Sequence, residues 1–81
     1  MNELMNLLFS ADPNFFLQVE KYTSYEIATM LSESRDELTS RRAKALLNKA
    51  SLREPMDFDM EVKRLYFAIF VNTKVSMGNY E

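Results

Sequence analysis

The chain of 81 residues contains one glycine, Gly78, and two prolines, Pro13 and Pro55. The tight turns of β-hairpins need residues that adopt positive φ, and glycine supplies most of them. A sheet of short antiparallel strands would therefore lack turn residues here, whereas helices joined by short loops need few. Hydrophobic residues make up 47% of the chain, which is enough for a core. We expect a single all-α domain over residues 1–81, built as a compact bundle of four to five short helices.

Capping signatures divide the chain into these helices. An Asp-Pro pair and two Ser/Thr-x-x-Glu capping boxes precede apolar side chains at helical spacing, and an Asp precedes the last helix. The signatures are Asp12-Pro13, Thr23 with Glu26, Ser34 with Glu37, and Asp57 or Asp59. The expected helices cover residues 3–9, 13–22, 24–31 and 35–51, followed by a last helix from about residue 57. We expect residues 76–81 to form a loose tail.

The last helix is apolar on two sides. One stripe at i, i+3, i+4 and i+7 spacing predicts the side that faces the core. It consists of Val62, Leu65, Tyr66, Ile69, Phe70 and Thr73. Phe67 and Val71 fall on the opposite side. A buried strand over residues 65–71 is the competing interpretation, because this run is aromatic and β-branched. We favour a helix that lies at the centre of the bundle.

Charge is unevenly distributed along the chain, although the net charge is only −2. Residues 35–53 carry six basic and two acidic side chains, and the next eight residues, 54–61, carry four acidic and no basic ones. Two interpretations remain open. The two blocks keep the surface hydrated, or the basic helix is a docking face for an anionic partner.

Side chains for catalysis and metal binding are scarce. The chain has no His and no Cys, so it lacks an imidazole base, a thiol nucleophile and a zinc ligand set. Asp57, Asp59 and Glu61 resemble the start of a calcium loop. Val62 and Ala68, however, occupy the positions where that loop needs Gly and a bidentate Glu. We expect a protein that is not an enzyme and that binds no metal or cofactor.

Residues 24–47 resemble a helix-turn-helix unit, most closely those of sigma-factor region 4 and similar regulators. The matching residues are Glu26, Ile27, Ala28, Leu31, Ser34 and Leu38. Ser32, Glu33 and Arg41 depart from the pattern, in the turn and near a usual core position. The resemblance implies DNA binding through the second helix of the pair. The residues it assigns to DNA are Arg35, Thr39, Arg42, Lys44, Lys49 and Arg53.

The alternative, which we prefer, is a small regulator or adaptor of bacterial or phage type that binds another protein as an inhibitor or tether. Six methionines and ten Phe and Tyr residues exceed what four short helices must bury, and this surplus also leaves self-association open. The candidate interface residues are Phe67 and Val71 on the last helix, and Arg41, Arg42, Lys44 and Lys49 on the basic helix. Because no apolar run approaches 18 residues and no basic N-terminal stretch indicates a signal peptide, we expect a cytoplasmic protein without membrane insertion.

Overall fold

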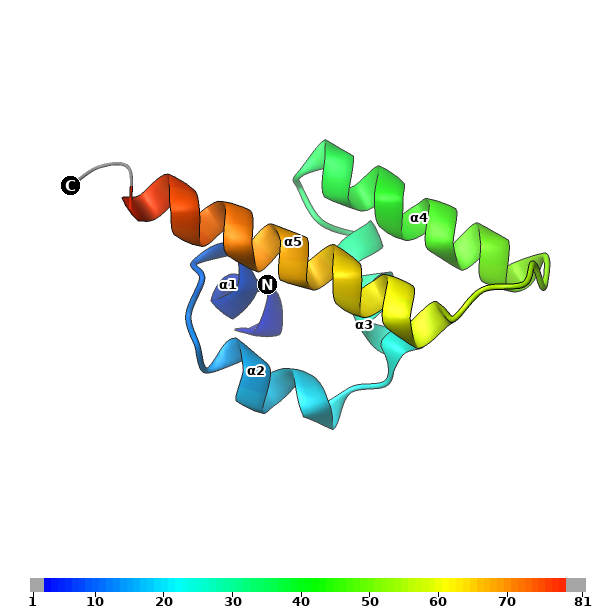
Figure 1. Ribbon diagram of the computed structural model, residues 1–81, viewed down its shortest axis with the longest axis horizontal. Coiled ribbons are helices and arrows are strands. Elements are labelled where there is room, and N and C mark those ends of the chain that lie inside the picture. The colour runs from blue at the N-terminus through cyan, green and yellow to red at the C-terminus, as the bar shows by residue number, and fades with distance from the viewer. Residues whose placement is uncertain (1–2, 79–81) are drawn as a thin grey trace.

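The computed structural model describes residues 3–78, and within this range every regular element is helical (Figure 1). The elements are α1 (Glu3–Phe9), α2 (Phe15–Gln18), a 3-10 turn η1 (Val19–Lys21), α3 (Ser24–Ser32), α4 (Glu37–Ser51) and α5 (Phe58–Gly78). The predicted all-α bundle is therefore confirmed. The segment 65–71, for which a strand was the alternative, lies inside α5.

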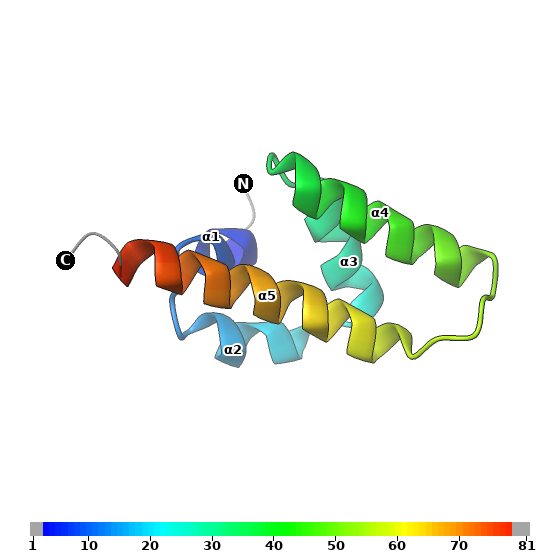
Figure 2. The same ribbon diagram turned by 45° about the horizontal axis from the view of Figure 1, so that its top comes forward.

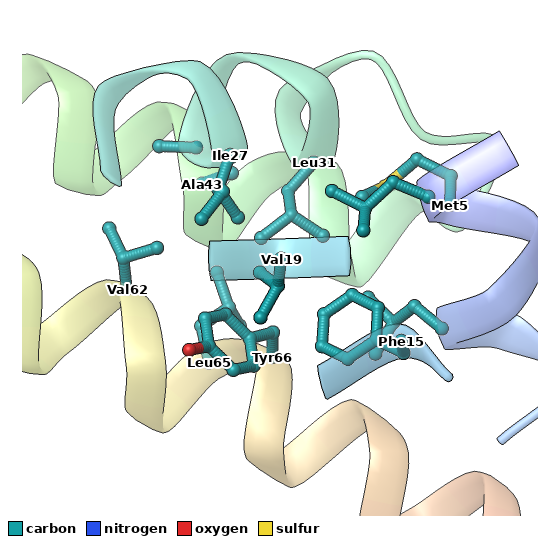
Figure 3. Packing of buried hydrophobic residues seen from close by; sticks show 12 residues of the cluster. Met5, Phe15, Val19, Ile27, Leu31, Ala43, Val62, Leu65 and Tyr66 are labelled. Carbon is teal, nitrogen blue, oxygen red and sulfur yellow. The ribbon is translucent and has the colours of Figure 1, made fainter. Parts of the chain in front are cut away.

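The last helix lies at the centre of the bundle, as predicted. α5 packs against α1, α3 and α4, and it runs across the other helices in both views (Figures 1 and 2). Its inward side chains Val62, Leu65 and Tyr66 are buried and point toward α2 and α3 (Figure 3). A helix that contacts three others in an 81-residue chain fixes the relative positions of all of them.

The hydrophobic core gathers side chains from every helix. Its largest fully buried members are Phe15, Leu4, Leu8, Leu31 and Val62. Phe15 sits between helices, with its ring centroid 5.2 Å from that of Tyr66 in an edge-to-face contact. Edge-to-face pairs at this separation stabilise a fold beyond the area they bury. Phe15 therefore helps to attach the N-terminal third of the chain to α5, together with the direct packing of α1 on α5.

Two of the expected helix caps are present. Thr23 and Glu26 form the reciprocal capping box of α3: the Glu26 N–H donates to the Thr23 hydroxyl, and the Thr23 N–H donates to the Glu26 carboxylate. Asp57 accepts a hydrogen bond from the N–H of Met60 in the first turn of α5. These local contacts satisfy backbone donors that no helix can satisfy internally.

Three expected boundaries differ from the structure. The expected helix 13–22 is shorter and divided, because the Asp12 carboxylate accepts the N–H of Asn14 in a turn and the last residues tighten into η1. α4 begins at Glu37 and not at Arg35, because Asp36 and not Ser34 caps it. α5 continues through Gly78, so the expected loose tail is wrong for residues 76–78, and residues 79–81 lie outside the described range.

Two residues after the ends of α1 and α4 lies a residue with positive φ, Ala11 (φ 54°) and Arg53 (φ 56°), respectively. After α4, the N–H of Arg53 donates to the Ala50 carbonyl and the N–H of Glu54 donates to the Lys49 carbonyl. This is the Schellman arrangement, in which glycine is the usual residue because a Cβ is strained at positive φ. Arg53 is exposed, so its side chain offsets little of this strain by packing.

We predict that Arg53→Gly stabilises the fold by about 1 kcal/mol, since it removes the Cβ from a left-handed position. In a domain of this size, that gain raises the melting temperature by roughly 4–8 °C. Arg53→Ala is the matched control, because it removes the charge but keeps the Cβ. Thermal unfolding followed by circular dichroism measures both variants. Equal melting temperatures for the two would contradict the conformational explanation.

Candidate interaction surfaces

The side of α5 that points away from the core is open along the whole helix. We call it the outer face of α5, and it consists of Met60, Lys63, Arg64, Phe67, Ala68, Val71, Lys74, Val75 and Gly78, all of which are exposed. Phe67, Val71 and Val75 follow one another at four-residue spacing and are 47%, 53% and 58% exposed. They form one continuous apolar strip, because residues four apart on a helix are neighbours.

Aromatic neighbours hold the first residue of this strip in place. The Phe67 ring stacks on Phe16 of α2 at 5.2 Å and on Tyr66 at 5.3 Å between ring centroids. Phe16 in turn contacts Phe70, at 4.7 Å. An exposed aromatic ring with fixed neighbours loses little conformational entropy when a partner covers it. Phe67 and Val71, which the sequence suggested for a protein interface, therefore both lie exposed on this face.

Val75 and Ala68 also belong to the outer face, but the sequence analysis did not single them out. Val75 lies within the expected helix and continues the four-residue spacing of Phe67 and Val71, but only those two residues were assigned to the second apolar side. Ala68 is a small, exposed residue next to Phe67 on this face. The signal that could have found them is the unbroken helical spacing through Gly78.

The charges around the strip are all positive. Lys63, Arg64 and Lys74 lie on the outer face, and no acidic residue occurs from Val62 to Gly78. Acidic side chains are confined to the segment before and in the first turn of α5, at Asp57, Asp59 and Glu61. The outer face itself therefore carries only positive charge, and the acidic side chains lie off the face near its N-terminal end.

A second exposed surface covers α4. All four residues suggested there for protein binding (Arg41, Arg42, Lys44 and Lys49) are exposed, as are Arg35 and Arg53. Arg41 forms an ion pair with Glu37 at 2.7 Å. Both side chains are more than two-thirds exposed, so this pair contributes less than about 1 kcal/mol and leaves Arg41 accessible. Arg42 and Lys49, seven residues apart, share one side of the helix, whereas Lys44 points about 160° away from Arg42.

Thr39 is buried, whereas the neighbouring Leu38 is exposed. Thr39, a candidate DNA contact, is only 3% exposed, and its hydroxyl and N–H both donate to the Asp36 carboxylate. It therefore cannot face DNA. Leu38, one of the residues that match the helix-turn-helix pattern, is 54% exposed. With Ala45 and Leu52 it forms an exposed apolar row at seven-residue spacing on α4, which the sequence analysis missed.

The pair α3–α4 matches the helix-turn-helix pattern in part. The matching residues Ile27, Ala28 and Leu31 are buried. The Ser40 hydroxyl donates to the Ser32 carbonyl at 2.6 Å, so the two helices are directly linked. The turn differs, because Glu33 has φ −94° and no residue from 33 to 36 has positive φ. The backbone of this turn therefore does not need a glycine, and Ser32 adopts its conformation without strain.

The described residues offer no sign of a metal centre or a membrane span. Within residues 3–78, no three carboxylates come close enough together to hold a metal ion. None of the described helices combines the length and the apolar character needed to cross a bilayer. A shallow groove of about 620 Å³ lies between α1 and the loop after α3. Met5, Phe9 and Met30 form its apolar wall, and Arg35 and Asp36 lie at its edge.

Comparison with known proteins gives no relative. No protein-family model matches the chain, and no curated protein or solved structure is significantly similar to it.

The Asp36 cap predicts a specific dependence of stability on pH. Hydrogen bonds from the Thr39 hydroxyl and N–H hold the pKa of Asp36 below its ordinary value of 3.8. A carboxyl whose pKa is lower in the folded state stabilises the fold fully above the unfolded-state pKa. This stabilisation is lost as the pH falls from about 3.8 through the lower pKa of the folded protein.

We expect Asp36→Ala to destabilise the protein by about 1 kcal/mol at neutral pH, as loss of an N-cap usually does. Urea unfolding at several pH values should show the gap between native protein and variant narrowing below about pH 4. Glu33→Ala removes an exposed acid from the same loop, and it should change stability by less than about 0.5 kcal/mol. A gap that persists unchanged at low pH would contradict the role of the ionised Asp36 carboxylate.

Proposed function

We propose that this protein is a non-enzymatic regulator or adaptor, of bacterial or phage type, that binds another protein through the outer face of α5. One observation carries the proposal: the apolar strip of Phe67, Val71 and Val75 is continuous and exposed, although the core is complete without it. Single exposed apolar residues are common, but a contiguous patch on a small protein favours an interaction surface.

The composition of the face suits protein docking. Phe67 offers an aromatic anchor near the middle of α5, and aromatic residues are enriched among those that dominate binding energy. Lys63, Arg64 and Lys74 surround the strip with a charged rim. An apolar centre with a polar rim is the usual anatomy of a protein interface. The rim also selects partners, because only a surface without excess positive charge can approach it.

A photo-reactive amino acid in place of Val71 tests this proposal. In an extract of the native host, it should form a discrete protein adduct that disappears when Phe67→Asp is added to the same chain. Phe67 is half exposed, so Phe67→Asp should leave the helical circular-dichroism spectrum unchanged. The same photo-reactive group in place of Asn48, an exposed residue of α4, is the matched control. Equal labelling from the two positions, or no adduct at all, would overturn the proposal.

DNA binding through α4 is the second candidate function. It is favoured by the exposed basic residues Arg35, Arg41, Arg42, Lys49 and Arg53 on one helix and its ends. Such a cluster attracts phosphates even in a protein of net charge −2, because binding depends on local charge.

A titration of amide NMR signals with a DNA duplex of about 20 base pairs at low salt checks this second function. If it is correct, shifts concentrate at residues 35–53, and added salt reverses them. The double variant Arg42→Glu, Lys49→Glu should lose these shifts, whereas Lys63→Glu on α5 should keep them. Unchanged spectra throughout the titration would exclude DNA binding by α4 under these conditions.

A further inference from the structure

The apolar row of α4 consists of Leu38, Ala45 and Leu52, all of which are exposed. Leu38 and Leu52 are 54% and 64% exposed. Seven residues are almost two helical turns, so successive members differ by only about 20° around the axis and the row stays on one side. Leu52 directly follows α4 but keeps the helical path, because its N–H donates to the Asn48 carbonyl at 3.0 Å. The fold therefore leaves two leucine side chains in water on one side of a helix.

Basic side chains flank this row on both sides. At about 100° per residue, Arg41 lies on one side of the row, and Arg42 and Lys49 lie on the other. All three are exposed. Their long aliphatic stems extend an apolar surface while their charges stay in solvent. Glu37 is the only acidic residue of α4 and is already paired with Arg41. The exposed side of α4 therefore has an apolar centre and an excess of positive charge at its margins.

The core uses the opposite side of α4. Ala43 is buried in the core, and Leu46 and Leu47 pack against it. The apolar row is thus separate from the contacts that hold α4 in the bundle. Apolar residues at seven-residue spacing, with charges beside them, are what one helix presents to another. The row from Leu38 to Leu52 is about 21 Å long, so a partner helix of about four turns covers it.

The row favours a protein over DNA as the partner of α4. Phosphates are contacted by basic and polar side chains, and leucines placed between the bases gain little from a hydrated phosphate backbone. In a recognition helix, the N-terminal residues reach the edges of the bases. Near the start of α4, however, Thr39 is buried and Leu38 is exposed. A protein segment that carries both apolar side chains and carboxylates complements the leucines and the bases together.

We infer that the exposed side of α4 binds an acidic amphipathic helix of a partner protein. The apolar stripe of that helix covers Leu38 and Leu52, and its carboxylates pair with Arg41, Arg42 and Lys49. The inference goes beyond the proposed function, because this site lies on a different helix from the outer face of α5. The row offers one residue in seven and makes a narrow contact, so the charges at its margins select the partner.

An amide NMR titration of the full chain with a synthetic peptide tests the inference. The peptide is a helix of about 20 residues with Leu at its a and d positions and Glu at the positions that flank them. A control peptide has Lys in place of each Glu. The acidic peptide should shift signals on the exposed side of α4, and added salt should weaken its binding. An acidic peptide that leaves α4 unshifted, or a control peptide that shifts α4 equally, would contradict the inference.

Replacement of the two leucines separates this inference from attraction by charge alone. The double variant Leu38→Gln, Leu52→Gln keeps every charge of α4, and it should bind the acidic peptide at least about tenfold more weakly. Both side chains are more than half exposed, so circular dichroism should show an unchanged fold. Val71→Gln, Val75→Gln is the matched change on α5 and should leave the affinity at α4 unaltered. Equal affinities of the native protein and the leucine variant would overturn the inference.

A competition with DNA tests the rival partner. A duplex of about 20 base pairs is added to the protein–peptide sample at about 0.15 M salt, where phosphate contacts are partly screened. If the inference is correct, the peptide stays on α4 when the duplex is present at equal concentration. Displacement of the peptide by the duplex would assign α4 to nucleic acid and would exclude the acidic helix as its preferred partner.

Discussion

The contact between Phe15 and α5 is the interaction on which the rest of the structure depends. The Phe15 ring is fully buried and meets Phe16, Tyr66 and Phe70, so it joins the N-terminal helices to the central one. Loss of a buried Phe side chain typically costs about 3–5 kcal/mol, a large part of the stability of a small domain. The same contact brings Phe16 beside Phe67. The position of Phe67 in the exposed strip therefore depends on the packing of the core.

Size explains why this strip is left exposed. A chain of 81 residues buries a smaller fraction of its surface than a large domain does, and three helices already cover one side of α5. Nothing in residues 3–78 remains to cover the other side. Val71 and Val75 are more than half exposed and gain little stability from the monomer fold, whereas Val62 on the inner side is fully buried. This difference makes the outer face, and not the core, the place to look for function.

The sequence predicted most of the fold because its signals are local. The Thr23–Glu26 capping box, the Asp57 cap and the inward stripe of α5 depend on spacing within one helix. The start of α4 was harder, because Ser34 with Glu37 and Asp36 with Thr39 are both acceptable caps. The choice of Asp36 places Thr39 inside and Leu38 outside. The choice of cap depends on how α4 packs against α3, where the Ser40 hydroxyl donates a hydrogen bond to the Ser32 carbonyl. The spacing of residues within α4 carries no information about this packing. The candidate surface on α5 was predicted at Phe67 and Val71. Its extension to Val75 follows from the same four-residue spacing, which was not followed beyond Val71.

The two candidate surfaces belong to different helices and do not exclude each other. α4 and α5 pack together through their inner sides, and the outer side of each faces solvent (Figure 2). A partner protein bound along α5 would therefore leave Arg41, Arg42 and Lys49 of α4 accessible. One molecule could then hold a protein at α5 and an anionic partner at α4 together, and two ligands held by one molecule meet at a high effective concentration.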